Sequence, residues 1–184
     1  MQERQLEAFR QLEGLLMTIE LHAIAAPVFT ARLKSLVHLL KIGEAEGPAR
    51  NLSEEAILGA RLAPDMFELK RQVQIATDHA KGAMARLGDL DIPSYADTEQ
   101  TFAELYARIE KTLAFVASVP AAAVNGREEA IVTLKLRHET MELKAIDYLQ
   151  GYAFPNFYFH LTTAYDILRH LGMPVGKRDF LWRE

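Results

Sequence analysis

The chain has 184 residues, 49% of them hydrophobic and 25% charged, which suits one globular domain and excludes a disordered protein. Its formal net charge is -4 and its basic residues are scattered, so it lacks the electrostatic signature of a nucleic-acid-binding protein. The absence of cysteine excludes disulfides, thiolate metal ligands and a cysteine nucleophile, and gives no reason to expect an oxidising compartment.

The N-terminal segment is charged and lacks the apolar centre of a secretory signal. No stretch reaches the ~18 uninterrupted apolar residues that typify a membrane span, so we expect a cytoplasmic protein without a membrane partner. Residues 1–19 are predicted to form a helical arm that precedes a domain over 20–184. Apolar residues in the arm recur every three or four positions: Leu6, Phe9, Leu12 and Leu16. The arm could pack on its own domain or on a partner subunit.

Apolar residues at helical spacing predict four long helices. The first is expected over 25–41, with Pro27 in its first turn. The second is expected over 64–87, and the third starts near Thr98 with Asp97 as its N-cap. A helical segment over 147–153 precedes Pro155, which requires a new start or a kink before the last helix.

The second helix has the most regular pattern, with apolar residues separated by three and four positions in strict alternation: Met66, Leu69, Val73, Ala76, Ala80, Ala83 and Leu87. The three alanines would let a neighbouring helix approach closely. Before the last helix, alternation of apolar and polar residues over 131–136 and 141–144 predicts a half-buried β-hairpin. The fold class is therefore all-α, a four-helix bundle with one small β-hairpin.

Polar residues beside the apolar stripes suggest a pocket between two helices. Gln72 and His79 lie seven residues apart, on one side of the second helix. Asn156, His160 and Thr163 line one edge of the last helix. If the two helices are neighbours, the histidines can face each other across a cleft, where helical bundles hold metals and ligands. The alternative is that both histidines are hydrogen-bonded core residues and that Asn156 satisfies backbone groups freed near Pro155.

The stretches RLAPDMFELKRQVQIATDHAKGAMARL, residues 61–87, and FPNFYFHLTTAYDILRHLGMPVGKRDFL, residues 154–181, resemble a bacterial and fungal family of unknown function. That family is similar to the DinB/YfiT-like superfamily of metalloenzymes, and the resemblance covers residues 20–181. It implies a DinB-like four-helix bundle, often homodimeric, and superfamily members include thiol transferases.

The resemblance also implies a metal site. Metal-binding members of the superfamily use one histidine from the second helix and an HxxxH pair from the last. His79 matches the first position and His160 the first member of the pair, but Ala164 stands where the third histidine belongs. A divalent metal such as Zn, Ni or Fe would therefore meet two imidazoles, whereas a catalytic zinc-type site wants three protein ligands.

Two functional hypotheses follow. In the first, the chain is a small-molecule-binding protein or an enzyme of transferase or hydrolase type, with the pocket around His79 and His160. In the second, it is a non-catalytic homodimeric module with a degenerate metal site. A cavity that is lined by both histidines and open to solvent would favour the first, and imidazoles fully satisfied by their neighbours would favour the second.

Overall fold

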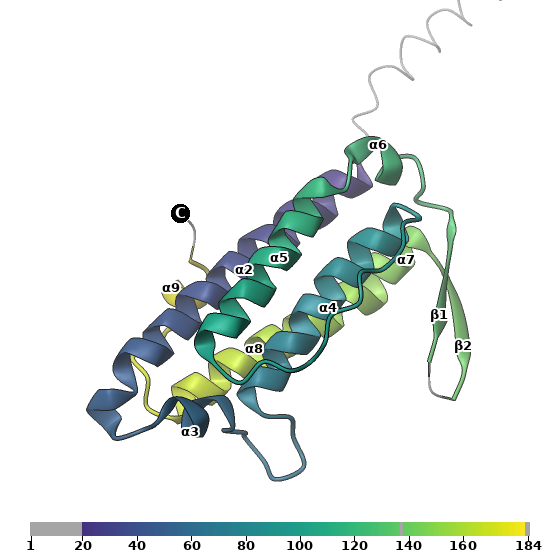
Figure 1. The fold of residues 1–184 in the computed structure, drawn as a ribbon. Coiled ribbons are helices and arrows are strands. Elements are labelled where there is room, and N and C mark those ends of the chain that lie inside the picture. The colour runs from purple at the N-terminus through teal and green to yellow at the C-terminus, as the bar shows by residue number, and fades with distance from the viewer. Residues whose placement is uncertain (1–19, 137, 183–184) are drawn as a thin grey trace, which may run out of the picture.

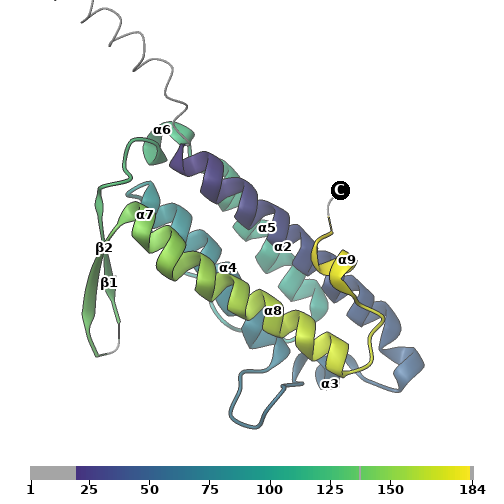
Figure 2. The same ribbon diagram turned by 180° about the vertical axis from the view of Figure 1, so that it is seen from behind.

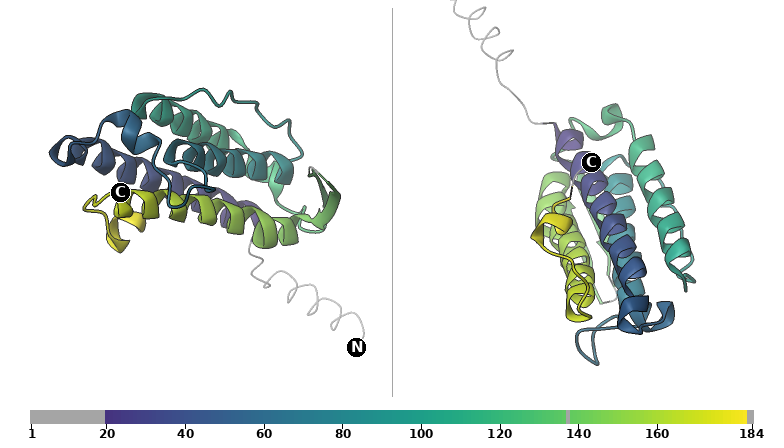
Figure 3. Two further views of the ribbon diagram at one scale, coloured as in Figure 1. Left: turned by 90° about the horizontal axis from the view of Figure 1, so that it is seen from below. Right: turned by 90° about the vertical axis from the view of Figure 1, so that its left-hand side faces the viewer.

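The computed structural model describes residues 20–136 and 138–182, which form a bundle of four long helices with a hairpin at one end (Figures 1 and 2). The views in Figure 3 show the four rods running side by side. The long helices are α2 (Leu21–Glu46), α4 (Leu69–Leu87), α5 (Phe102–Ser118) and α8 (Phe154–His170). Helix α4 packs against both α5 and α8. Helix α2 packs against the same two helices and completes the bundle. This confirms the predicted all-α class and the four-helix bundle.

The strands pair in antiparallel fashion, with Val132 opposite Leu143 and Leu134 opposite Met141, which confirms the predicted hairpin. Val132 and Leu134 point inward and are buried. The shorter elements of the described chain are η1 (Pro48–Arg50), α3 (Glu54–Leu58), α6 (Ala121–Val124), β1 (Ile131–Lys135), β2 (Thr140–Lys144), α7 (Ala145–Tyr148), the π-helical turn η2 (Leu149–Ala153) and α9 (Lys177–Phe180).

The core forms around the apolar stripe of α4. From Leu69 to Leu87 every predicted member of the stripe is fully buried, and Ala76, Ala80 and Ala83 allow α8 and α5 to approach closely. The facing stripe of α8 is equally buried, from Phe157 through Leu161 to Leu168. The helical periodicity therefore predicted the core correctly.

Helix α2 begins earlier than predicted. It spans Leu21–Glu46, so Pro27 lies inside the helix and not in its first turn. Proline removes one backbone hydrogen bond, which leaves the Ala23 carbonyl without its usual donor. Both Pro27 and Ala23 are exposed, so water can satisfy that carbonyl. The helix therefore continues through the proline.

The next two long helices begin later than predicted. The chain from Pro64 to Phe67 forms turns, and α4 starts at Leu69, whose N–H donates to the Ala60 carbonyl. Helix α5 starts at Phe102, because Thr101 and Glu104 form a reciprocal capping box. Asp97, predicted as the N-cap, instead pairs with arginine side chains.

The π-helical turn resolves the break predicted before the last helix. The N–H of Phe154 donates to the Leu149 carbonyl, five residues back, so the helix widens for one turn and continues past Pro155. The Asn156 side chain donates to the Tyr152 carbonyl over 2.8 Å. Helices α7 and α8 thus form one continuous rod with a π-turn where the sequence predicted a new start or a kink.

The C-terminal segment is fastened to α2. Arg32 donates to the Phe180 carbonyl over 2.7 Å, and Ser35 donates to the Trp182 carbonyl over 3.0 Å. The ring of His38 stacks on Trp182 at 5.0 Å. The predicted N-terminal arm, residues 1–19, lies outside the described residues.

Among the described residues, only α2 is long and apolar enough to cross a membrane, with a mean hydropathy of 1.3 over 18 residues. Its apolar stripe, including Phe29, Leu33 and Leu36, is fully buried inside the bundle. Burial of this kind is expected of the core helix of a bundle, so the apolar character of α2 is weak evidence for a membrane span.

Candidate functional site

The two histidines predicted to converge do lie together at the interface of α4 and α8. The rings of His79 and His160 are stacked, with centroids 5.8 Å apart and planes inclined by 15°. His79 comes from the middle of α4 and His160 from the second turn of α8, and both side chains are partly buried. The structure therefore brings residues 81 positions apart in the sequence into one small cluster.

Gln72 determines the tautomer of His160. The Gln72 amide nitrogen donates to the Phe67 carbonyl over 3.0 Å, so its oxygen is the group that faces His160 Nδ1 at 2.7 Å. An amide oxygen can only accept, so Nδ1 carries the proton. In the neutral ring, Nε2 of His160 then keeps a free lone pair, which can bind a ligand or accept a proton.

Both imidazoles are neutral near pH 7. Burial lowers the pKa of His160 to about 4, and repulsion from His79 and Arg71 adds to the shift. Burial also lowers the pKa of His79, assisted by the positive charge of Arg86 and opposed by Asp78. Desolvation penalises the imidazolium form and leaves the neutral form in place. Two neutral imidazoles side by side are potential general bases or metal ligands.

Aromatic side chains extend this cluster along the bundle. Tyr152, in the π-turn, lies 6.1 Å from His79, and Tyr148 stacks on Tyr152 at 6.0 Å. The Tyr148 hydroxyl accepts a hydrogen bond from Arg86 Nη1 over 3.3 Å. We call the row of Gln72, His160, His79, Tyr152, Tyr148 and Arg86 the polar row. One end of it therefore carries an amide and the other a guanidinium.

A cavity of about 180 Å³ lies beside the polar row, between α4, the hairpin and the π-turn. It is lined by Asp78, His79, Arg86, Leu134, Lys135, Leu136 and Tyr152. His79 therefore reaches the cavity, whereas His160 and Gln72 do not line it. π-turns often occur at functional sites, and here the turn places the Tyr152 ring in the cavity wall.

Two of the predicted pocket residues form hydrogen bonds within their own helix. Asn156 donates to the Tyr152 carbonyl, and the hydroxyl of Thr163 donates to the Phe159 carbonyl over 2.8 Å. Neither residue lines the cavity beside His79. The structural alternative for Asn156, that it satisfies a backbone group near Pro155, matches the observed contact.

The residues present do not fit the three-ligand metal site of the superfamily. Ala164 is fully buried at the position of the third histidine. Asp78, the carboxylate beside His79, has its Oδ1 within 2.9 Å of Lys81 Nζ and 2.8 Å of Arg108 Nη2. Within residues 20–136 and 138–182 no group of three histidine or carboxylate side chains is arranged to hold a metal ion. The donor set therefore consists of two imidazoles.

Arg86, Tyr148 and Tyr152 were not predicted from the sequence as members of the site. The aromatic residues resemble ordinary core residues in a sequence, and Arg86 resembles any charge near a helix end. One signal was available: Gly82 lies inside a helix with a strong, regular apolar pattern, four residues before Arg86. A glycine there lowers helix stability by about 1 kcal/mol, so it implies a close approach by another group.

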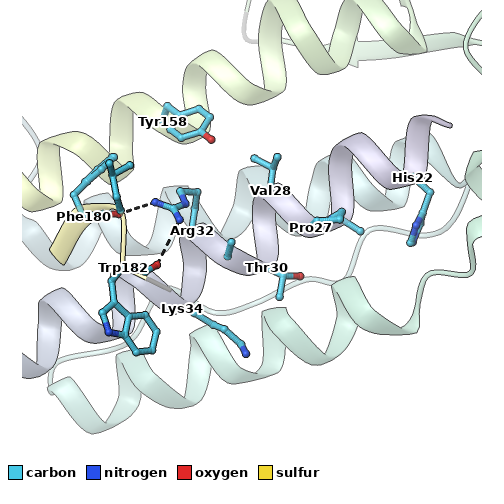
Figure 4. A pocket seen from close by; sticks show the side chains of 12 residues that line it. His22, Pro27, Val28, Thr30, Arg32, Lys34, Tyr158, Phe180 and Trp182 are labelled. Carbon is cyan, nitrogen blue, oxygen red and sulfur yellow. Dashed lines mark hydrogen bonds between the residues drawn. The ribbon is translucent and has the colours of Figure 1, made fainter. Parts of the chain in front are cut away.

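A larger cavity than the one beside His79 lies on the outer side of α2 (Figure 4). It measures about 810 Å³ and runs between α2, Tyr158 of α8 and the C-terminal segment. In Figure 4, Arg32 points toward the carbonyl groups of Phe180 and Trp182, so its guanidinium holds the wall together. We call this the α2 groove; it contains no member of the polar row.

The four-helix bundle with a hairpin before its last helix is a DinB-like fold, as comparison with a solved structure shows. The crystal structure of a DinB family member from Shewanella denitrificans aligns with a TM-score of 0.81 and 35% sequence identity, over 89% of this chain and 93% of that chain. A family model described as a domain of unknown function, DUF1993, matches residues 21–181, and the chain belongs to this family. No curated protein matches the chain.

Proposed function

We propose that the protein binds a small molecule in the cavity beside His79 and acts on it by acid–base chemistry of the transferase or hydrolase type. The observation that carries the proposal is the stacked pair of neutral imidazoles, one of which lines a cavity. Neutral imidazole can accept a proton from a nucleophile such as water or a thiol. Gln72 fixes the His160 ring in one tautomer, as expected for a group that must present a lone pair.

The surroundings of His79 support this proposal. A group with a shifted pKa in a cleft is a candidate functional residue, although structural ion-pair networks also shift pKa values. Here desolvation is the main cause of the shift for both histidines. His79 also forms no hydrogen bond with any other described residue, so its ring nitrogens are available to a ligand.

The test is identification of a molecule that co-purifies with the protein. Protein purified under native conditions is denatured, and the released small molecules are compared by mass spectrometry between wild type and His79→Phe. We expect one compound at near-stoichiometric amount in wild type and its loss in the variant, with Thr163→Val as the matched control that retains it. If the same compounds are released from wild type and His79→Phe, His79 does not hold the ligand.

A divalent metal is tested separately. Elemental analysis of protein purified without a histidine tag would show near-stoichiometric Zn, Ni or Fe if a metal is essential, and His79→Ala would abolish it. Because the described residues place two imidazoles and no third ligand at this site, we expect sub-stoichiometric metal, since tight catalytic sites use three protein ligands. Stoichiometric metal that depends on both histidines would add a metal-bound step to the proposal.

The second candidate is a non-catalytic homodimer with a degenerate metal site, and the α2 groove is the observation that favours it. Its lining includes the apolar side chains of Val28, Tyr158 and Leu181, and such a surface suits a second copy of the chain. Light scattering at micromolar concentration should give the mass of a dimer, and Val28→Glu should give a monomer. A monomeric wild type would count decisively against this candidate.

A further inference from the structure

We propose that the cavity beside His79 binds the carboxylate or phosphate group of its small-molecule ligand, and that Arg86 is the anion-binding residue. The inference rests on the proposed function, because it names the ligand class for the same cavity. It depends on three independent features: an arginine without an acidic partner, a glycine that makes room for it, and a positive balance of charge in the cavity wall.

Arg86 is partly buried and has no acidic partner among the described residues. Its one hydrogen bond goes to the Tyr148 hydroxyl, and its guanidinium carbon lies 5.9 Å from the centre of the same ring. Guanidinium has five N–H donors in a planar fork that matches carboxylate and phosphate. By contrast, the buried Arg108 on the other side of α4 contacts three carboxylates. Arg86 therefore retains the donors that an anion needs.

Gly82 makes room for the guanidinium. A Cβ atom at position 82 would lie 2.7 Å from Arg86 Nη1, well inside van der Waals contact. The arginine side chain therefore folds back along α4 over the glycine, toward the turn that carries His79, instead of extending into solvent. Because His79, Gly82 and Arg86 follow at intervals of three and four, all three share one face of the helix. The helix accepts a destabilising glycine where the guanidinium lies.

The charges around the cavity favour an anion. Arg86 and Lys135 both contribute positive charge to the lining, one from α4 and one from the hairpin. Asp78 also lines the cavity, but its Oδ1 contacts both Lys81 and Arg108, which offset its negative charge. The lining therefore carries two cationic side chains and one carboxylate, and that carboxylate already has two cationic partners.

The size and apolar lining of the cavity define the rest of the ligand. Its volume of about 180 Å³ lies below the roughly 300–1,000 Å³ of pockets for drug-sized molecules, so the ligand is small. Leu134 and Leu136 supply apolar walls from the hairpin, and Tyr152 supplies an aromatic one. A small organic acid or phosphate ester with a short apolar body fits this lining, with its anionic group on Arg86 and the remainder beside His79.

The experiment measures anion binding with two simple probes, acetate and inorganic phosphate. The histidine ring signals are followed by NMR during titration with each probe, against sodium chloride at matched ionic strength. We expect a saturable shift of the His79 signal with at least one probe and no saturable shift of the signal of His170, which is exposed at the end of α8. A stronger response to acetate assigns a carboxylate ligand, and a stronger response to phosphate assigns a phosphate ester.

Variants test the role of Arg86. Arg86→Gln removes the charge and should weaken probe binding at least tenfold, and Gly82→Ala should weaken it by displacing the guanidinium while the alanine itself favours the helix. Arg178→Gln is the matched control, because it removes one positive charge from an exposed residue on α9 that does not line the cavity. Circular dichroism and the urea midpoint show whether each variant is folded.

The proposal is overturned if neither probe gives a saturable shift, or if folded Arg86→Gln binds as well as wild type. These outcomes can be separated from failure of the proposed function. Loss of a co-purifying ligand in His79→Phe together with unchanged probe binding in Arg86→Gln would remove only the anion site. If Arg86→Gln loses probe binding while His79→Phe retains the co-purifying ligand, the anion site stands and only the acid–base role of His79 is rejected.

Discussion

Polar side chains are buried against two sides of helix α4, and the two groups differ in how many of their hydrogen-bonding atoms have partners. On the side facing α5, Arg108 is 3% exposed and is surrounded by partners. Its Nη1 lies 3.0 Å from Glu99, its Nη2 lies 2.8 Å from Asp78, and its Nε donates to Thr77 over 2.7 Å. This charged cluster satisfies the arginine and ties α4, α5 and the loop between them together.

On the side facing α8, the polar row leaves donors and acceptors unused. His79 has ring neighbours but no hydrogen bond to another described residue, and Arg86 has one. The two sides are separated by a single residue step of about 100°, from Asp78 to His79. A polar cluster with every partner in place stabilises the fold, whereas one with spare donors beside a cavity has capacity for a ligand.

The largest effect is expected from Arg108→Ala, because it leaves the carboxylates of Asp78 and Glu99 without their main partner. Removing one member of a buried ion pair costs about 3–5 kcal/mol, and partial exposure of the carboxylates reduces this to roughly 2–4 kcal/mol. The free energy of unfolding from urea titration measures the loss. Arg178→Ala on the surface is the control. A loss below about 1 kcal/mol would show that the cluster is not a main stabilising element.

Gln72→Leu should have the next largest effect, and it acts on the polar row. Gln72 is 1% exposed and bonds both the Phe67 carbonyl and His160, so its removal should cost about 1–2 kcal/mol. Nitrogen-15 shifts of the histidine rings should show Nδ1 of His160 protonated in wild type and a mixture of tautomers in the variant. A wild-type ring protonated at Nε2 would contradict the assigned hydrogen bond.

Helical periodicity was enough to predict the bundle, because the stripe from Leu69 to Leu87 is long and regular. It was insufficient for the helix ends, which depend on local contacts such as the capping box of Thr101 and the exposure of Pro27. The histidine pair was predictable because both residues flank a stripe. The guanidinium end of the row was not, since it depends on a side chain folding back over Gly82 and on the π-turn that positions Tyr152.

The pH dependence of stability distinguishes the two sides of α4 further. The pKa of His160 is lowered to about 4 in the folded protein, and an unfolded histidine titrates near 6.5. The unfolded chain therefore binds more protons between these values, so the stabilising contribution is present above pH 6.5 and is lost as the pH falls toward 4. Allowing for solvent screening, His160 should account for about 1 kcal/mol between pH 7.5 and 5.0.

The measurement is the change in unfolding free energy between pH 7.5 and 5.0 for wild type, His160→Gln and His170→Gln. The first variant should reduce the dependence without abolishing it, because burial also lowers the pKa of His79. The second variant replaces an exposed ring and serves as the control. This interval lies above the range in which paired carboxylates such as Asp97, whose pKa is lowered by Arg71 and Arg108, begin to take up protons. A pH dependence equal in wild type and His160→Gln would mean that His160 titrates normally.

Asn156→Ala is expected to have the smallest effect. It tests whether the ligand site extends beyond the polar row to Asn156. The Asn156 amide bonds the Tyr152 carbonyl within one rod, so its loss should cost about 0.5–1 kcal/mol in unfolding free energy. Probe binding and any co-purifying ligand should be unchanged, because Asn156 does not line the cavity beside His79. If the variant keeps its stability and loses the ligand, then Asn156 contacts that ligand and the site extends along α8 past the π-turn. Because Asn156 bonds the backbone of the π-turn, loss of both stability and ligand would instead mean that the turn must be rigid to hold Tyr152 in the cavity wall.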